Sequence, residues 1–218
     1  MKWSEQTWIE SLPVYHKILD LPFINELMNG TLAKEKFLFY IQQDIIYLGE
    51  FGKVLAGIVT RLKKQSHAEA FMKFAADTIY VEGNLHESFL NQLSSSVITE
   101  PSPSCLLYTG HMRQLLSSAS VEATMAGVLP CFWIYKEVGD YILSHQTHNS
   151  ENPYQQWINT YGGADFEKAV TNAINICDEL AQQCTNEQQQ EMTDAFIRST
   201  KLEWMFWNSA WNMEKWPV

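Results

Sequence analysis

Hydrophobic residues recur every three or four positions along most of the chain, and polar residues fill the positions between them. This period is typical of α-helices that bury one face, whereas an exposed strand alternates every second residue. We find no alternating segment of that kind. One of the stretches with the helical period, residues 31–64, has apolar residues at Phe37, Ile41, Leu48, Phe51, Leu55, Ile58 and Leu62. The pattern predicts an all-α protein.

Glycine and proline are sparse and collect in a few short segments, which predict where the helices end. Helices are expected over 31–64 (with Thr31 as N-cap), 66–93, 104–116, 121–144, 154–160, 165–184 and 187–212. Residues 4–28 are expected to form one or two helices broken near Pro13 and Pro22. Loops are predicted over 94–103 and 146–153, with a turn at residues 161–163. Since no repeat or inter-domain linker is visible, we expect residues 1–218 to form a single compact helical bundle.

The charge and composition exclude several classes of protein. The formal net charge is −10, and no basic cluster suited to nucleic-acid phosphates stands out. No apolar run approaches the length of about 18 residues that a membrane-spanning helix needs. The first residues lack the apolar segment of a secretory signal, and the four cysteines (Cys105, Cys131, Cys177 and Cys184) form no CxxC pair. We therefore expect a cytoplasmic protein with reduced thiols.

Two carboxylates interrupt apolar helix stripes. Asp44 falls among the apolar positions of the 31–64 helix, and Glu203 occupies the middle of the stripe of the last helix. A buried carboxylate is costly unless it is paired, protonated or used in chemistry. Asp44 is therefore part of a structural ion pair, of a helix-to-helix hydrogen bond or of a site, and Glu203 is part of an internal salt bridge or of a site. A desolvated Glu203 would have a raised pKa, which suits a general acid or base.

Cys131 lies on the inward face of the 121–144 helix, directly after Pro130. A buried cysteine alone is more often a small hydrophobic residue than a nucleophile. A proline within a helix removes a backbone hydrogen bond, and such irregularities often mark sites. If Cys131, Glu203 and Asp44 face one cavity, they supply a thiol nucleophile, an acid/base and a substrate-orienting carboxylate.

A metal centre is the main competing chemistry. Glu82 and His86 lie four residues apart on one helix, but di-iron bundles use Glu-x-x-His elements in pairs, and no second copy is found. We therefore expect no metal. We expect Glu82 and His86 to hydrogen-bond in the core or to support the residues that line the pocket, without contacting the ligand.

Several segments resemble, in order and spacing, those of the TenA family (thiaminase II, aminopyrimidine aminohydrolase). They are Gln43-Asp44 with Tyr47, Glu82-Gly83-Asn84-Leu85-His86, Tyr108-Thr109-Gly110-His111-Met112, Leu129-Pro130-Cys131-Phe132-Trp133-Ile134-Tyr135 followed by Glu137-Val138-Gly139, Tyr161-Gly162-Gly163, and Leu202-Glu203 with Phe206-Trp207. Together they span nearly the whole chain. Because Cys131 is present, the resemblance is to the cysteine-containing branch of the family.

The resemblance implies a haem-oxygenase-like bundle without haem, metal or other cofactor, usually a homotetramer. It implies hydrolysis of 4-amino-5-aminomethyl-2-methylpyrimidine to the hydroxymethyl pyrimidine and ammonia. It also implies cleavage of thiamine to that pyrimidine and the thiazole alcohol, in thiamine salvage. A pyrimidine-binding or regulatory protein without turnover is the alternative on the same fold.

The resemblance also implies roles for individual residues. Cys131 would add to the pyrimidine ring, Glu203 would transfer the proton at the ring or leaving group, and Asp44 would hydrogen-bond the amino-pyrimidine edge. The residues implied to line and stack the ring are Tyr47, Tyr108, Tyr135, Tyr161 and Phe206.

Overall fold

The computed structural model describes the backbone of residues 1–92, 100–146 and 152–218, and the side chains of the same residues except 80–92. The helices are α1 (Trp3–Leu19), α2 (Pro22–Asn29), α3 (Lys34–Val59), α4 (Gln65–Gln92), α5 (Pro103–Ser118), α6 (Val121–His145), α7 (Gln155–Tyr161), α8 (Ala164–Ala181) and α9 (Asn186–Asn212). The described residues contain no strand, so the predicted all-α fold is confirmed. Over the same ranges, no helix is both long and apolar enough to cross a membrane.

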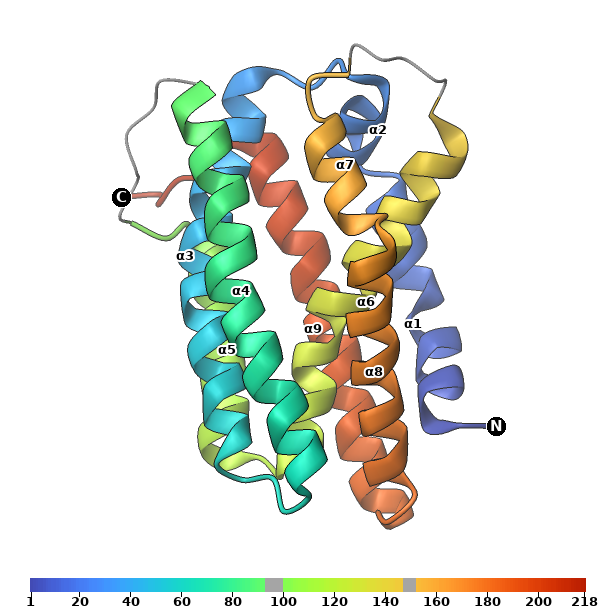
Figure 1. Ribbon diagram of the computed structural model, residues 1–218. Coiled ribbons are helices and arrows are strands. Elements are labelled where there is room, and N and C mark those ends of the chain that lie inside the picture. The colour runs from blue at the N-terminus through green and yellow to red at the C-terminus, as the bar shows by residue number, and fades with distance from the viewer. Residues whose placement is uncertain (93–99, 147–151) are drawn as a thin grey trace.

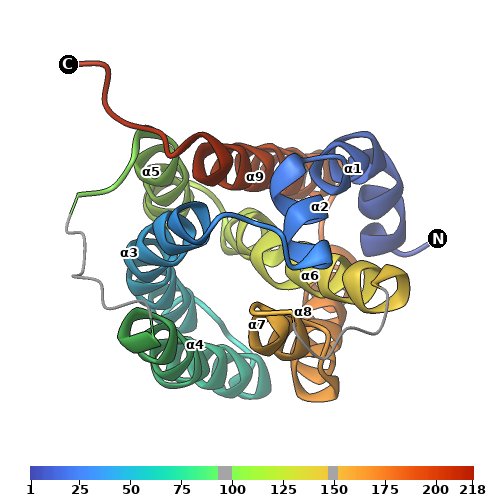
Figure 2. The ribbon, with the colours of Figure 1, turned by 90° about the horizontal axis from the view of Figure 1, so that it is seen from above.

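The bundle consists of long helices whose axes run roughly side by side (Figure 1). Seen from above, α6 lies near the centre, with α9 and α1 on one side of it and α7 and α8 on another (Figure 2). The most extensive helix contacts are those of α3 with α4 and of α6 with α9. The helices that carry the predicted site residues therefore pack against one another through the middle of the molecule.

Several predicted helix boundaries are wrong. The helix predicted over 31–64 ends at Val59. Pro13 does not break the first helix but lies inside α1. Its side chain is exposed, and Ile9, whose carbonyl loses its partner, is 54% exposed, so water can satisfy that group. Thr31 is not an N-cap, because α3 begins only at Lys34, after Ala33. The predicted break at Pro22 is confirmed, and this proline opens α2.

Side-chain caps fix the start of three helices that carry site residues. Ser102 Oγ accepts a hydrogen bond from Cys105 N at 3.3 Å, and Ser120 Oγ accepts one from Ala123 N at 3.1 Å. Thr185 and Gln188 form a reciprocal capping box at the start of α9. Such caps satisfy amide groups that a helix N-terminus leaves open, and each typically stabilises by about 1 kcal/mol.

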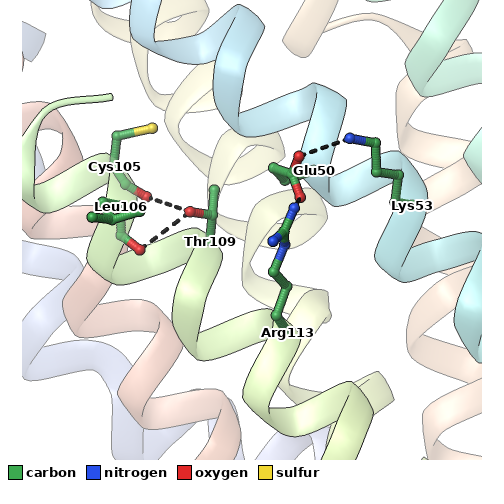
Figure 3. A network of polar contacts seen from close by, with 6 residues as sticks. All are labelled: Glu50, Lys53, Cys105, Leu106, Thr109 and Arg113. Atoms are coloured by element: carbon green, nitrogen blue, oxygen red, sulfur yellow. Dashed lines mark hydrogen bonds and ion pairs between the residues drawn. The ribbon is translucent and has the colours of Figure 1, made fainter. Parts of the chain in front are cut away.

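One ion pair joins α3 to α5, and hydrogen bonds within each helix lie beside it (Figure 3). Glu50 on α3 accepts a hydrogen bond from Lys53 Nζ at 2.8 Å and forms an ion pair with Arg113 on α5. The Thr109 hydroxyl donates to the carbonyl of Cys105 at 3.0 Å within α5. These contacts lie next to the segments of α3 and α5 that carry the predicted site residues.

Gly139 allows α6 and α7 to come unusually close. A Cβ atom at this position would lie 2.7 Å from both the Gly162 nitrogen and the Tyr161 carbonyl carbon. No side chain fits this contact without moving the backbone. This close contact between α6 and α7 determines the position of Tyr161, at the end of α7, in the bundle.

Candidate active site

Glu203 lies in the core of the bundle, with 1% of its surface exposed. The Tyr108 hydroxyl donates a 2.7 Å hydrogen bond to Glu203 Oε1. Burial raises the pKa of Glu203 to about 8, the hydrogen bond from Tyr108 partly opposes this rise, and the negative charge of Asp44 adds to it. The carboxyl group therefore carries a proton at neutral pH and is able to act as a general acid.

Asp44 is buried, and the Tyr40 hydroxyl lies one helical turn away. The Tyr40 oxygen is 3.4 Å from Asp44 Oδ2 and 3.4 Å from the Tyr135 hydroxyl, and it accepts a hydrogen bond from Trp157 Nε1 at 3.2 Å. The second buried carboxylate thus lies beside a hydroxyl on α3 that has polar contacts with both α6 and α7.

Cys131 is buried in the core and acts electrostatically on two tyrosines of the site. Burial raises the pKa of Tyr47, and the electrostatic influence of Cys131 is the next largest cause. Burial and the charge of Glu203 raise the pKa of Tyr108, and Cys131 again contributes. A group that influences both phenols lies close to both, so the thiol, Glu203 and Tyr108 belong to one neighbourhood.

The register of α6 on α9 agrees with this placement. A Cβ at Gly127 would lie 3.7 Å from that of Ala195, and further along the Tyr135 and Trp207 rings lie 4.9 Å apart. Both helices run in the same direction through these contacts. On α6, Cys131 lies midway between Gly127 and Tyr135. On α9, Glu203 lies between Ala195 and Trp207, which are the residues that those two contact.

Aromatic rings surround the polar groups. The Tyr47 ring lies 4.8 Å from that of Tyr108 and 5.6 Å from that of Phe206, and the Tyr135 ring lies 4.9 Å from that of Tyr161. Flat rings at these separations stack favourably on another flat ring. The rings thus form an aromatic cluster beside the Tyr108–Glu203 hydrogen bond.

The structure brings together the side chains predicted for the site: Asp44, Tyr47, Tyr108, Cys131, Tyr135, Tyr161, Glu203 and Phe206. The side chains of Glu82 and His86 lie outside the described residues, so their supporting role stays a prediction. Among described residues, no group of three His, Cys, Asp or Glu side chains is placed to hold a metal ion.

Further polar groups, not among the side chains predicted for the site, lie beside it. Tyr40 lies beside Asp44, and Trp157 donates to the Tyr40 hydroxyl. Ser199 and Trp207 lie one turn before and after Glu203. Their Oγ and Nε1 atoms are buried and, within the described part of the protein, have no hydrogen-bond partner. Tyr40 lies four residues from Asp44, and Ser199 and Trp207 each lie four residues from Glu203. Residues at this spacing are neighbours on a helix surface, and this was the signal in the sequence that pointed to them.

The other buried cysteines also lie within reach of carboxylates, Cys105 of Asp44 and Cys177 of Asp178. Burial raises the pKa of Cys105 to about 12, and burial also raises the pKa of Cys177. The Cys105 thiol donates to the carbonyl of Gln43 at 3.6 Å. Both thiols are thereby held in the unreactive protonated form.

Comparison with known proteins supports the predicted resemblance. The model of the TENA/THI-4/PQQC family matches residues 9–213. An aminopyrimidine aminohydrolase of Bacillus subtilis (strain 168) is 33% identical, with 99% of this chain and 92% of that protein aligned. The structure of a TenA homologue from P. horikoshii OT3 superposes with a TM-score of 0.88 at 26% identity, covering 97% of this chain and 99% of that one.

The fold is shared more widely than the sequence. A domain of unknown function with a haem-oxygenase-like fold from Shewanella denitrificans OS217 superposes with a TM-score of 0.75 at 13% identity, and 96% of this chain and 92% of that chain are covered. This likeness confirms the expected haem-oxygenase-like bundle.

Proposed function

Because the chain belongs to the TENA/THI-4/PQQC family, we propose that it is an aminopyrimidine hydrolase of thiamine salvage. Its substrate is 4-amino-5-aminomethyl-2-methylpyrimidine, and its products are the hydroxymethyl pyrimidine and ammonia. The name of the Bacillus subtilis relative supports this reaction class. The observation that carries the proposal is the Tyr108–Glu203 hydrogen bond, which joins a protonated carboxyl group to the buried neighbourhood of Cys131.

The proposed reaction begins when Cys131 Sγ forms a bond to the pyrimidine ring carbon beside the one that carries the aminomethyl group. The thiol proton passes to a ring nitrogen on the edge that Asp44 holds. The ring has lost its aromaticity, and its displaced electron pair can expel the amine from the side methylene carbon. Glu203 donates its proton to the departing nitrogen, so ammonia leaves as a neutral molecule.

Water completes the cycle. Its oxygen forms a bond to the methylene carbon, and its proton returns to the Glu203 carboxylate. The carbon–sulfur bond then breaks, the ring regains aromaticity, and the ring-nitrogen proton returns to sulfur. The sum is substrate plus water giving alcohol plus ammonia, and both side chains end in their starting state. Thiamine carries the same pyrimidine and methylene group. Its bond to the thiazolium nitrogen breaks with the electron pair on nitrogen, so the ring leaves as a neutral thiazole without a proton from Glu203, and the proton of the added water passes to solvent.

The test uses purified protein with the aminomethyl pyrimidine and measures ammonia and the hydroxymethyl product. We expect turnover by the wild type and by Cys184→Ser, which changes a cysteine far from the site in sequence and only partly buried. Glu203→Gln should lose about 10²- to 10⁴-fold in kcat, the usual contribution of a general acid. Cys131→Ser should lose at least as much.

The alternative function gives a different result. A protein that binds the pyrimidine without turnover would give heat on calorimetric titration but no product over hours, and that outcome would overturn the hydrolase. Full activity of Cys131→Ser would overturn the nucleophile alone.

We also propose that the protein assembles as a homotetramer. Apolar side chains are exposed on two helices, at Met72 and Ile79 on α4 and at Leu106 and Leu107 on α5. Exposed apolar groups of this kind favour burial at subunit contacts. Light scattering should give four times the chain mass of 25.2 kDa, and a monomer mass would overturn the assembly.

A further inference from the structure

Gln43 is buried on α3, directly before Asp44 and one turn before Tyr47. Its side chain reaches the segment that leads into α5. Gln43 Oε1 accepts a hydrogen bond from Ser102 N at 2.7 Å, and Gln43 Nε2 donates to the carbonyl of Glu100 at 3.3 Å. A buried amide that bonds two backbone groups in this way restrains the position of that segment on α3.

The restraint continues from Ser102 into α5. Ser102 Oγ accepts a hydrogen bond from Cys105 N at 3.3 Å, so the residue that Gln43 holds is also the N-cap of α5. Tyr108 follows Cys105 by about one helical turn, and its hydroxyl donates the 2.7 Å hydrogen bond to Glu203. The position of the start of α5 therefore determines whether this hydroxyl reaches the carboxyl group.

The ion pair of Arg113 with Glu50 is a second connection between α3 and α5, and it is the weaker one. The Arg113 side chain is 61% exposed, and water screens exposed ion pairs so that they contribute little. Gln43 is only 3% exposed, so its hydrogen bonds form away from water. Gln43 is thus the stronger of these two restraints on α5.

The chain after α9 contacts the same segment before α5. A Glu214 carboxylate oxygen accepts a hydrogen bond from Ser104 N at 2.9 Å, and Trp216 Nε1 donates to the carbonyl of Pro101 at 3.0 Å. These contacts do not involve Gln43, so they remain when its side chain is changed. A substitution at Gln43 should therefore displace the start of α5 without unfolding the protein.

We propose that Gln43 is a positioning residue for the reaction, because it holds the start of α5 where the Tyr108 hydroxyl reaches Glu203. The inference rests on the proposed function for the reaction that Glu203 serves. The restraint on Tyr108 is measurable without turnover.

The sign of a pKa change at Glu203 identifies the group that moves. The groups that interact electrostatically with Glu203 are Asp44, Tyr47, Tyr108 and Tyr135. Gln43→Met removes the amide without adding a charge, so it acts on Glu203 through the positions of these groups. A weaker hydrogen bond from Tyr108 raises the pKa of Glu203, whereas movement of Asp44 away from Glu203 lowers it.

The test measures the pKa of Glu203 by carboxyl carbon NMR in wild type, Gln43→Met and Tyr108→Phe. Gln189→Met is the matched control, since Gln189 Nε2 also donates to a backbone carbonyl, that of Ala181 at 2.7 Å, near the start of α9. Gln43→Met should raise the pKa by about half or more of the rise in Tyr108→Phe, and Gln189→Met should leave it unchanged. An unchanged or lowered pKa in Gln43→Met would overturn the inference.

The Tyr108→Phe background separates positioning from a general loosening of the fold. With no hydroxyl to position, Gln43→Met should raise the pKa of Glu203 no further. An equal rise in both backgrounds would overturn the inference.

Turnover of the aminomethyl pyrimidine tests the role of Gln43 in the reaction. Gln43→Met should lower kcat about tenfold or more, because small displacements of groups at a site have effects of this size. KM should stay within about twofold of wild type, and Gln189→Met should resemble wild type. A wild-type kcat in Gln43→Met would overturn the role in the reaction.

Ser102→Ala decides the question if Gln43→Met does not fold. It removes the cap on Cys105 N but keeps the N–H group that Gln43 binds, and the loss of one cap is a modest change. The pKa of Glu203 should rise in this variant too, and an unchanged value would overturn the inference. If none of the proteins turns over the pyrimidine, the hydrolase proposal fails, while the pKa of Glu203 still decides whether Gln43 positions Tyr108.

Discussion

Tyr108 on α5 and Glu203 on α9 are joined by a 2.7 Å hydrogen bond in the core of the bundle. This bond lowers the pKa of Glu203, while burial and the charge of Asp44 raise it, and the result is about 8. The two neighbours thus act on the same carboxyl group in opposite directions. Its protonation near neutral pH depends on the balance between them.

Changes at these neighbours should shift the pKa of Glu203 in opposite directions. Tyr108→Phe removes a hydrogen bond to the charged form, so the pKa should rise above 8. Asp44→Asn removes a repelling negative charge, so the pKa should fall. Carboxyl carbon NMR across a pH series measures both shifts directly, with the Glu203→Gln spectrum assigning the resonance. Shifts of the same sign in the two variants would contradict this account of the site.

The same carboxyl group should make stability depend on pH. Its folded pKa of about 8 exceeds the ordinary value of 4.5. The stability contributed by its protonated form is therefore fully present below pH 4.5 and is lost as pH rises through 8. Glu203→Gln removes this titration. Relative to the variant, the wild type should lose a few kcal/mol of unfolding free energy between pH 4.5 and pH 8.

Urea unfolding of both proteins at several pH values in this range measures the difference. Glu187→Gln, at an exposed position at the start of the same helix, is the control and should follow the wild type. An identical pH dependence of wild type and Glu203→Gln would show that Glu203 does not titrate in this range.

Two glycines should respond oppositely to alanine. At Gly139, a Cβ would lie 2.7 Å from the backbone of Tyr161 and Gly162, so Gly139→Ala should cost about 1–3 kcal/mol of stability and displace Tyr161. At Gly110, within α5, a Cβ meets nothing within 4 Å. Gly110→Ala should stabilise the protein by about 0.5–1 kcal/mol, because alanine favours a helix. Thermal unfolding compares the two, and a stabilised Gly139→Ala would contradict the tight contact of α6 with α7.

The sequence predicted the buried face of each helix more reliably than the contacts between helices. The period of apolar residues indicated that Asp44 and Glu203 face the core, because helical geometry alone determines the face. The Thr31 boundary was wrong, since local preference for a cap does not decide where α3 begins. The bond from Trp157 to Tyr40 joins residues 117 positions apart, and only the tertiary fold brings them together.

The Tyr40 hydroxyl beside Asp44 gives a further prediction. Tyr40→Phe removes the hydroxyl that lies 3.4 Å from Asp44 Oδ2, so the carboxylate loses a group that orients it. If Asp44 binds the amino-pyrimidine edge, KM for the aminomethyl pyrimidine should rise about tenfold, the value of one lost hydrogen bond. The variant should also be about 1–3 kcal/mol less stable, because it leaves the buried Nε1 group of Trp157 without its acceptor.

A double-mutant cycle separates these two effects. Trp157→Phe should destabilise the wild type, because the Tyr40 hydroxyl loses its donor. In the Tyr40→Phe background the same change should cost less, since it removes the Nε1 donor that Tyr40→Phe left unsatisfied. The free energies of unfolding of the four proteins give the coupling, and KM follows in parallel. We expect coupling of about 1 kcal/mol in stability, whereas KM should depend mainly on Tyr40. Additive losses of stability would mean that the Trp157–Tyr40 hydrogen bond contributes nothing, and an unchanged KM in Tyr40→Phe would remove Tyr40 from the substrate site.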